Sequence, residues 1–338
     1  MSGLAVVLVT YDSADGLPEV LDALAEQRLP GDEVVVVDNG SRDDSAAIAR
    51  AHPAVDRVLE PGANLGFASG CNHGAAATTA PILLFLNPDA VPQPGCLDAL
   101  RAAPADWAAW QGVVLMGDGR HVNSAGNEVH FLGFSWAGRP GEPVQGLPAE
   151  PWEAPALSGA CLAVRREAWG TGFPDHFFMY FEDLDLSLRL RLAGRRTGVV
   201  PAARVVHDYA FDKGAGKRRL LERNRWMCLL RCWPPRLLLA SLPLLLALEP
   251  LLLLIALREG WAGAKARAIA DVVAGLPRAL RERREVQAAA VLDPGDFAAL
   301  LRSDLGSPYF GPIGASPAVT RMLGAAWRAV RVLAGIRY

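Results

Sequence analysis

The sequence has few cysteines, and no spacing among them indicates a disulfide or a metal site. Five cysteines are scattered over 338 residues, and no two form a CxxC pair. An odd number without pairing argues against a disulfide framework, and the missing CxxC spacing argues against a zinc site. We therefore expect reduced thiols in a cytosolic compartment.

The sequence also lacks an excess of positive charge. The formal net charge is −2, and lysine occurs only three times, so nearly all basic residues are arginines. A chain without a global basic excess lacks the electrostatic signature of a nucleic-acid-binding protein. The first residues do not combine a positively charged segment with a short apolar run, so we expect no secretory signal peptide.

Two glycine-rich phosphate-binding signatures are absent. The first apolar run is followed by Thr10-Tyr11-Asp12-Ser13, where a dinucleotide-binding protein would carry GxGxxG. The segment Gly214-Ala215-Gly216-Lys217 resembles the end of a P-loop, but Phe211 occupies the position of the required upstream glycine. The sequence therefore excludes both of these nucleotide-binding classes.

What the sequence does contain is a large apolar fraction arranged in short runs. Hydrophobic residues make up 51% of the chain, enough for a sizeable core. Continuous apolar runs that alternate with helical patterns predict an α/β fold with a mostly parallel sheet flanked by helices. Ser41 and Asp44 resemble a capping box for one of these helices. The expected strands span 4–10, 33–38, 55–59, 82–86, 158–164 and 199–207, and the expected helices span 16–27 and 44–51.

Polar residues follow three of the expected strands. They are Thr10 and Tyr11, then Asp38, then Asn87 and Asp89. Carboxyl ends of parallel strands share one edge of a sheet, where ligands bind. Asp38 suits hydrogen bonding to a nucleotide base, and Asp89 suits a hard divalent cation that bridges phosphates. Taken singly, Asp38-Asn39-Gly40 and Asn87-Pro88-Asp89 also fit ordinary turns.

Two further stretches combine small and polar residues. In Asn64-Leu65-Gly66-Phe67-Ala68-Ser69-Gly70-Cys71-Asn72, the glycines permit close backbone approach, and Asn64 and Asn72 offer amides for a donor molecule. An ordinary helix entry is the alternative. Ser158 and Gly159 begin an expected strand, where small residues leave room either for an acceptor or for tight packing.

An acidic helix is the most distinctive stretch. Phe178-Met179-Tyr180-Phe181 precedes three carboxylates, Glu182, Asp183 and Asp185, and a leucine stripe then continues to Gly194. Carboxylates in a first turn are favoured by the helix dipole, so simple capping is one interpretation. Their clustering behind aromatic residues favours an acid–base site, for which a partly dry environment is needed. His207, at the end of the last strand, is a candidate metal ligand.

The C-terminal part differs in character. Residues 237–257 are apolar with Glu249 as their one charge, and Pro243 and Pro250 predict a bent pair of shorter helices. Three alternatives remain open: helices on the membrane surface or re-entrant, a true span, or a buried or oligomer-interface helix. Residues 261–288 predict a helix with clustered arginines that suit anionic headgroups and lipid-linked diphosphates. Another amphipathic helix is expected near 327–332.

A set of motifs, taken together and in their order along the chain, resembles the inverting family 2 glycosyltransferases with a GT-A fold. Within that family the set is most similar to bacterial rhamnosyltransferases of the WbbL type. The motifs cover about residues 4–225. The matching stretches are Val-Thr-Tyr at 9–11, Val-Asp-Asn-Gly-Ser at 37–41, the stretch 64–72, Leu-Asn-Pro-Asp-Ala at 86–90, Ser-Gly-Ala-Cys at 158–161, Tyr-Phe-Glu-Asp-Leu-Asp-Leu at 180–186 and Val-Val-His at 205–207.

The resemblance implies roles for the residues at matching positions. Asp183 is implied as the catalytic base with Glu182 beside it, and Asp38 as the base-binding aspartate. Asp89 and His207 are implied as ligands of Mg²⁺ or Mn²⁺. Asn87 stands at the first position of the family's Asp-x-Asp motif, as it does in the rhamnosyltransferase branch. The sequence departs from the family after His207, where Asp208-Tyr209-Ala210 follows.

The resemblance also implies substrates, regions and location. The donor would be a dTDP- or UDP-sugar, with rhamnose as the candidate sugar, and the acceptor a lipid-linked or cell-surface glycan. Residues 1–225 would be catalytic, 226–290 membrane-associating and 291–338 a C-terminal tail. The protein would lie at the cytoplasmic side of the bacterial inner membrane, peripheral or monotopic, with a single span as the alternative and a homo-oligomer left open. Competing functions are a nucleotidyltransferase and a non-catalytic membrane scaffold.

Overall fold

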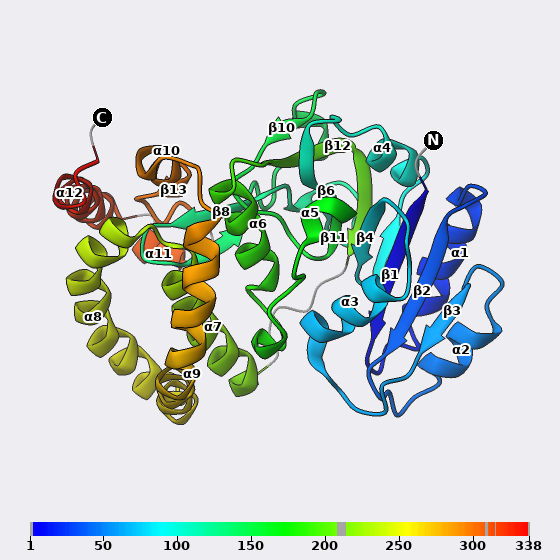
Figure 1. Cartoon of the computed structure of the whole chain (residues 1–338), viewed down its shortest axis with the longest axis horizontal. Helices are drawn as coiled ribbons and strands as arrows, with labels where there is room; N and C mark the ends of the chain where they lie inside the picture. Colours follow the sequence, from blue (N-terminus) through cyan, green and yellow to red (C-terminus); the bar gives the residue numbers. More distant parts are fainter. Residues whose placement is uncertain (1–2, 208–213, 308–309, 315, 337–338) are drawn as a thin grey trace. The chain divides into compact units, whose positions relative to one another are not determined.

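The computed structural model describes residues 3–207, 214–307, 310–314 and 316–336 (Figure 1). The chain forms two compact units. The first contains residues 1–127, 137–187 and 196–209, and the second contains 128–136, 188–195 and 210–338. The assignment of catalysis to 1–225, membrane association to 226–290 and a tail to 291–338 stays a prediction. Asp208-Tyr209-Ala210, where the family pattern is lost, lies outside the described residues.

A ten-stranded sheet forms the centre of the first unit, in the order β10-β12-β6-β11-β4-β1-β2-β3, with β5 paired to β12 and β7 to β6. Strand β1 is parallel to β2 and β4, β2 is parallel to β3, and β6 is parallel to β12, while β11 runs antiparallel to β4 and β6. The predicted mostly parallel α/β sheet is therefore confirmed. The strands are β1 (Leu4–Thr10), β2 (Glu33–Asp38), β3 (Arg57–Leu59), β4 (Ile82–Leu86), β5 (Ala90–Pro92), β6 (Trp107–Leu115), β7 (Val122–Ser124), β10 (Trp152–Glu153), β11 (Cys161–Arg165) and β12 (Arg196–His207).

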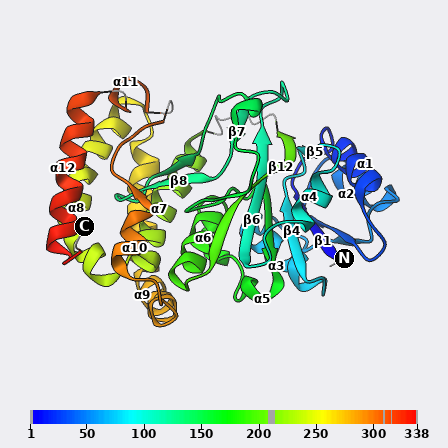
Figure 2. The same ribbon diagram turned by 90° about the horizontal axis from the view of Figure 1, so that it is seen from above.

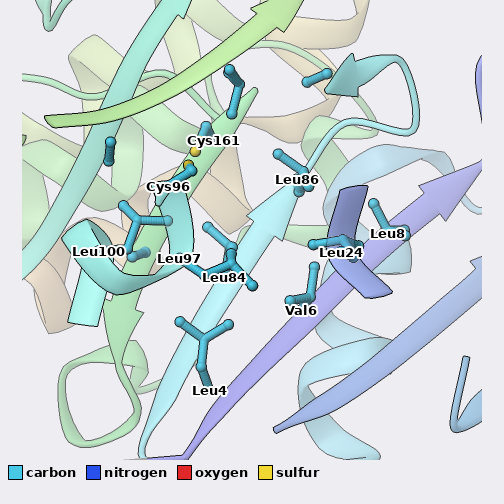
Figure 3. Packing of buried hydrophobic residues seen from close by; sticks show 14 of the residues in the cluster. Leu4, Val6, Leu8, Leu24, Leu84, Leu86, Cys96, Leu97, Leu100 and Cys161 are labelled. Atoms are coloured by element: carbon cyan, nitrogen blue, oxygen red, sulfur yellow. The ribbon is translucent and has the colours of Figure 1, made fainter. Parts of the chain in front are cut away.

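Strand β1 is apolar throughout because it is covered on both faces. Leu4, Val6 and Leu8 join the core cluster that also contains buried leucines of α1 and α4 (Figure 3). On the other face, Val7 and Val9 pack so closely against α3 that side chains at its Gly70 and Gly74 would collide with them. The helices of this unit are α1 (Leu17–Gln27), α2 (Ser45–Ala51), α3 (Gly66–Ala76), α4 (Cys96–Arg101), α5 (Arg166–Trp169) and the start of α6 (Glu182–Leu192), with 3₁₀ turns η1 (Val144–Gly146) and η2 (Asp175–Phe177).

The second unit is mainly helical. Helix α7 packs against α9, and α8 packs against both α9 and α12 (Figure 2). Its helices are α7 (Gly214–Cys232), α8 (Pro235–Arg258), α9 (Ala262–Ala288), α10 (Pro294–Ala299), α11 (Gly311–Gly314) and α12 (Pro317–Leu333). A small sheet, in the order β13-β8-β9, consists of β8 (Asn127–His130), β9 (Ser135–Ala137) and β13 (Leu301–Arg302).

Two local predictions are wrong. The bent pair of helices at 237–257 is a single helix, α8, with Pro243 and Pro250 inside it. A proline removes one backbone hydrogen bond but does not end a helix whose other residues are strong helix formers. The capping box is also wrong, because α2 has Asp44 at its N-cap without a side-chain cap. The hydroxyl of Ser41 donates to Asp38 instead.

Candidate active site

Asp38 ends β2 in a dense set of hydrogen bonds. Its Oδ1 accepts from Thr10 Oγ1 at 3.0 Å and from Ser41 Oγ at 2.5 Å, and its Oδ2 accepts from the backbone N–H groups of Gly40 and Ser41. The β1–β2 register pairs Thr10 with Asp38, so both lie at the carboxyl edge of the sheet. These bonds fix the carboxylate and hold it as an acceptor. Tyr11, which follows Thr10 in the chain, has 44% of its surface exposed.

Asn87, Pro88 and Asp89 form a turn between β4 and β5. The N–H of Ala90 donates to the carbonyl of Asn87 at 3.1 Å, which closes the turn, and the N–H of Asn87 donates to Ala160 O. Strand β5 then pairs antiparallel with β12 and places Ala90 opposite His207. As a result His207 Nε2 lies 3.0 Å from Asp89 Oδ1. The imidazole is buried, while 53% of the Asp89 side chain is exposed.

The donor atoms of this pair fit a divalent cation. Asp89 presents a carboxylate oxygen to solvent, and His207 presents a buried ring nitrogen to that carboxylate. Oxygen and imidazole ligands together suit Mn²⁺ and other borderline divalent ions, and the carboxylate alone suits Mg²⁺. The two predicted metal ligands are thus brought together by strand pairing.

Asp183 lies in the first turn of α6 and faces the start of β11. Its Oδ2 accepts from the backbone N–H of Gly159 at 2.8 Å, and its Oδ1 accepts from its neighbour Leu184 N. A Cβ at Gly159 would lie 3.5 Å from Asp183 Oδ2, an ordinary van der Waals contact, which shows how closely the two residues are packed. Because Cys161 pairs with Leu86 of β4, this segment lies at the same sheet edge as Asn87.

Burial perturbs both carboxylates at the start of α6. Loss of hydration raises the pKa of Asp183, and the Gly159 and Leu184 N–H groups offset part of that rise. Burial, followed by the nearby charge of Asp183, raises the pKa of Glu182 well above its ordinary value. Two adjacent carboxylates with raised pKa values can share protons as a coupled pair. Such perturbation is typical of acid–base sites.

The other predicted site residues have varied surroundings. Ser158 N donates to the buried Gln111 side chain, and Asp185 is fully buried. Asn64 caps the N–H of Gly66, and the Asn72 amide bonds to residues of the 173–175 segment. The roles of these residues toward donor and acceptor stay predictions.

Sequence reasoning missed two residues that organise this edge. Asn39 is buried, and its amide donates to Gly66 O at 2.9 Å. Asp175 accepts from both Ser69 Oγ and Asn72 Nδ2. Asn39 lies in the motif 37–41, but the motif does not indicate its partner, and Asp175 carries no signal beyond its polarity, because the partners of both residues are far along the chain and are brought near only by folding.

The sequence matches a known protein family and a curated relative. Residues 5–171 match the profile of Glycosyl transferase family 2. The N-acetylglucosaminyl-diphospho-decaprenol L-rhamnosyltransferase of Mycobacterium tuberculosis is 35% identical over 240 residues, which cover 62% of this chain and 78% of that protein.

Solved structures show the same fold at low sequence identity. GalNAc-T7 with UDP, GalNAc and Mn²⁺ is similar with a TM-score of 0.59 and 16% identity, over 73% of this chain and 51% of that one. S. aureus TarS 1–349 in complex with UDP-GlcNAc is similar with a TM-score of 0.51 and 15% identity, over 99% of this chain and 93% of that one. The predicted fold class is confirmed.

Proposed function

The chain belongs to glycosyltransferase family 2, and on that basis we propose that it transfers a sugar from a nucleoside-diphosphate donor to a lipid-linked glycan with inversion at the anomeric carbon. The observation that supports this most is the shared sheet edge. Asp38 ends β2, and the Asp89–His207 pair lies beyond the end of β4. Gly159, which binds Asp183, lies just before β11. Strand register brings these segments to one edge of the sheet, at the carboxyl ends of β1, β2 and β4.

Each of these residues has a distinct part in the proposed reaction. Asp38, fixed by Thr10 and Ser41, accepts hydrogen bonds from the donor's base, with Tyr11 and Asn87 near the nucleotide. Asp183 takes the proton from the acceptor hydroxyl, whose oxygen forms the new bond to the anomeric carbon as the bond to the diphosphate breaks. Its raised pKa improves its strength as a base while leaving it ionised on the basic side of that value.

Asp89 and His207 would hold Mg²⁺ or Mn²⁺ in this proposal. Bound there, the cation would neutralise the charge that develops on the leaving nucleoside diphosphate. The 3.0 Å approach of the two side chains supports a shared ligand site. Glu182 is buried beside Asp183, and burial together with the Asp183 charge raises its pKa well above the ordinary value, so it holds its proton more firmly than an ordinary glutamate.

A donor panel tests this function. Purified protein is incubated with UDP-, dTDP- and GDP-sugars, membrane lipid extract as acceptor, and Mg²⁺, Mn²⁺ or chelator, and nucleoside diphosphate release is measured. The relative's name specifies rhamnose as the sugar that it transfers, so a nucleoside-diphosphate rhamnose is the donor to include first. We expect metal-dependent release that requires the lipid extract. No release with any donor, together with no donor-induced rise in the melting temperature, would contradict the proposal and favour a non-catalytic scaffold.

The second unit supports a location at a membrane surface. Among the described residues, α8 is the helix whose length and composition would allow a membrane crossing. It carries exposed leucines along its length, and α9 adds an exposed apolar face. These residues are Leu239, Leu246, Leu251, Leu253, Leu254 and Leu257 on α8, and Ile269, Val273, Leu276 and Leu280 on α9. An apolar face of this kind inserts into the headgroup–acyl boundary of a bilayer.

A buried ionic cluster argues that α8 lies along the membrane and does not cross it. Glu249, within α8, is 2.6 Å from Arg225 Nη2 of α7 and 2.6 Å from Lys265 Nζ of α9, and it accepts from Trp226 Nε1 at 2.9 Å. Burial alone would raise the pKa of Glu249, but Lys265 and Arg225 outweigh it and the pKa is lowered. A crossing would carry these charges and the arginine-rich α7 into the hydrocarbon, which is costly.

Labelling distinguishes a surface helix from a span. Leu239 and Leu257 are 69% and 62% exposed near opposite ends of α8, while all five native cysteines are buried. Single variants Leu239→Cys and Leu257→Cys are treated with a membrane-impermeant maleimide in inside-out and right-side-out vesicles. We expect neither position to react in right-side-out vesicles, since the proposed location is cytoplasmic. Reaction of the two positions from opposite sides would show a span.

A further inference from the structure

Strained backbone conformations are concentrated directly before α6, the helix that carries Asp183. Phe178, Tyr180 and Phe181 have φ values of 64°, 70° and 71°, and they account for three of the five non-glycine residues with positive φ in the described parts of the chain. Bulky side chains rarely adopt this region, and such strain persists only when surrounding contacts impose it. The N–H of Asp185 donates to Phe181 O, so the strained segment sets where α6 begins and hence where Asp183 lies.

Gly66 makes the first contact that imposes this conformation. It has a φ of +82°, and a Cβ built on it would lie 2.4 Å from the carbonyl oxygen of Phe178 and 2.5 Å from its ring. Two residues later, the N–H of Ala68 donates to that same carbonyl at 3.1 Å. Only a residue without a side chain lets the N-terminus of α3 approach the Phe178 peptide so closely.

Asn39 connects this contact to the donor side of the site. Its side-chain amide donates to Gly66 O at 2.9 Å, and its own backbone N–H donates to Thr10 O. Asn39 directly follows Asp38, the residue assigned to the donor's base. One short chain of bonds therefore runs from the end of β2 through Gly66 to the Phe178 peptide.

Asn72 and Ser69 make a second anchor, one turn further along α3. Asn72 Nδ2 donates to Phe173 O at 2.8 Å and to Asp175 Oδ1 at 2.7 Å, while its Oδ1 accepts from Phe173 N. Ser69 Oγ also donates to Asp175 Oδ1, at 2.9 Å. Both ends of the Asn72 amide are thus engaged with the segment that leads into Phe178.

We propose that Gly66 and Asn72 are positioning residues, which act through the strained segment Phe178–Phe181 to hold Asp183 in its place on Gly159. This inference rests on the proposed function of Asp183. It gives the Asn64–Asn72 stretch a role at the catalytic helix, different from the donor contact that its sequence predicts. Through Asn39, the catalytic base Asp183 keeps its position relative to Asp38 at the end of the strand that is proposed to bind the donor.

A matched pair of glycine variants tests the proposal. Gly66→Ala places its methyl group on the Phe178 peptide, whereas Gly62→Ala, with nearly the same φ of +78°, meets no atom within 4 Å. Both variants therefore carry the strain of a non-glycine residue at positive φ, and only one disturbs the segment. We expect Gly66→Ala to lower kcat about 100-fold, as a displacement of about 1 Å can do. Its affinity for the free nucleoside diphosphate and its KM for the donor should be little changed, and Gly62→Ala should keep wild-type kcat.

Hydrogen exchange supplies a readout that does not depend on activity. Amides of residues 173–185 should exchange faster in Gly66→Ala than in Gly62→Ala, with far-UV circular dichroism confirming that both are folded. Equal exchange and equal kcat in the two variants would overturn the proposal. Wild-type protein that transfers no sugar would instead refute the proposed function, and the exchange comparison would still test whether Gly66 holds the segment.

Exchange of the side chains of Asn72 and Asp175 tests the second anchor. This test remains informative if Gly66→Ala does not fold. Asn72→Asp places a carboxylate against Asp175 and should lower kcat with little effect on donor KM. The double variant Asn72→Asp/Asp175→Asn restores a donor and an acceptor to this pair, so part of kcat should return. An unchanged kcat in Asn72→Asp would contradict a positioning role for this anchor, and so would a double variant that melts like wild type but recovers none of the lost kcat.

Discussion

His207 Nε2 lies 3.0 Å from Asp89 Oδ1, although Asp89 precedes β5 and His207 ends β12. The antiparallel pairing of these two strands, with His207 opposite Ala90, produces the approach. In the proposed site, this buried imidazole and half-exposed carboxylate would hold the metal ion.

Removal of either ligand should abolish metal-dependent activity. We expect Asp89→Asn and His207→Gln each to weaken Mn²⁺ binding at least about 10-fold, because each removes one of two ligands from the chain. Calorimetric titration of Mn²⁺ measures this directly. His52 and Asp22 form a similar pair at 3.1 Å on the surface, so His52→Gln is the matched control and should change nothing. Equal Mn²⁺ affinity in all these proteins would contradict the assignment.

The rate of transfer should fall at acid pH earlier than for an ordinary aspartate base. Burial raises the pKa of Asp183, and only its ionised form accepts a proton, so kcat/KM should decline as pH falls through that raised value. A pH–rate profile of the wild-type enzyme checks this. A profile that stays flat down to the ordinary pKa of aspartate would show that no buried carboxylate limits the rate.

Glu182 should make the protein less stable as pH rises. Its pKa in the folded state is well above the ordinary value, so the folded state binds more protons than the unfolded state between those two values. The free energy of unfolding should therefore decrease as pH rises through that window, and Glu182→Gln should remove this decrease. Urea denaturation at several pH values measures both slopes. Identical slopes in variant and wild type would contradict the prediction.

The ionic cluster at Glu249 should contribute strongly to the stability of the second unit. Glu249→Gln removes one of two carboxylates that pair with the buried Arg225 and Lys265, and Glu222 remains paired with both, so we expect a loss of about 1.5–3 kcal/mol in the free energy of unfolding. Glu259 follows α8 and pairs with Arg218 on the surface, so Glu259→Gln should cost only about 0–1 kcal/mol. Chemical denaturation compares the two, and equal losses would refute a special role for the buried cluster.

The sequence predicted those elements whose apolar pattern is continuous. The runs at Leu4–Thr10, Glu33–Asp38 and Ile82–Leu86 became β1, β2 and β4 with the expected bounds, because strands covered on both faces must be apolar throughout. The strands within residues 117–157 are harder to predict from the sequence. These residues contain the short strands β7, β8, β9 and β10, which are too brief for a clear periodicity.

The candidate site residues could be chosen from sequence, but their mutual contacts could not. Asp38 and Asp89 stand at strand ends, which the pattern of strands and helices reveals. The bond between Asn39 and Gly66, and the approach of Gly66 to Phe178, depend on how α3 packs beside β1 and β2. Such contacts join residues distant in sequence, so no local pattern encodes them.

Sugar transfer by Asp183→Asn measures the central claim most directly. The substitution keeps the size of the side chain and its place beside Gly159 N, but it removes the ability to accept a proton. Transfer to lipid acceptor is measured with the donor that the panel selects, and donor binding is measured separately by calorimetry. We predict loss of transfer by a factor of at least about 100 with donor affinity unchanged. Turnover equal to that of the wild type would contradict the assignment of Asp183 as the catalytic base.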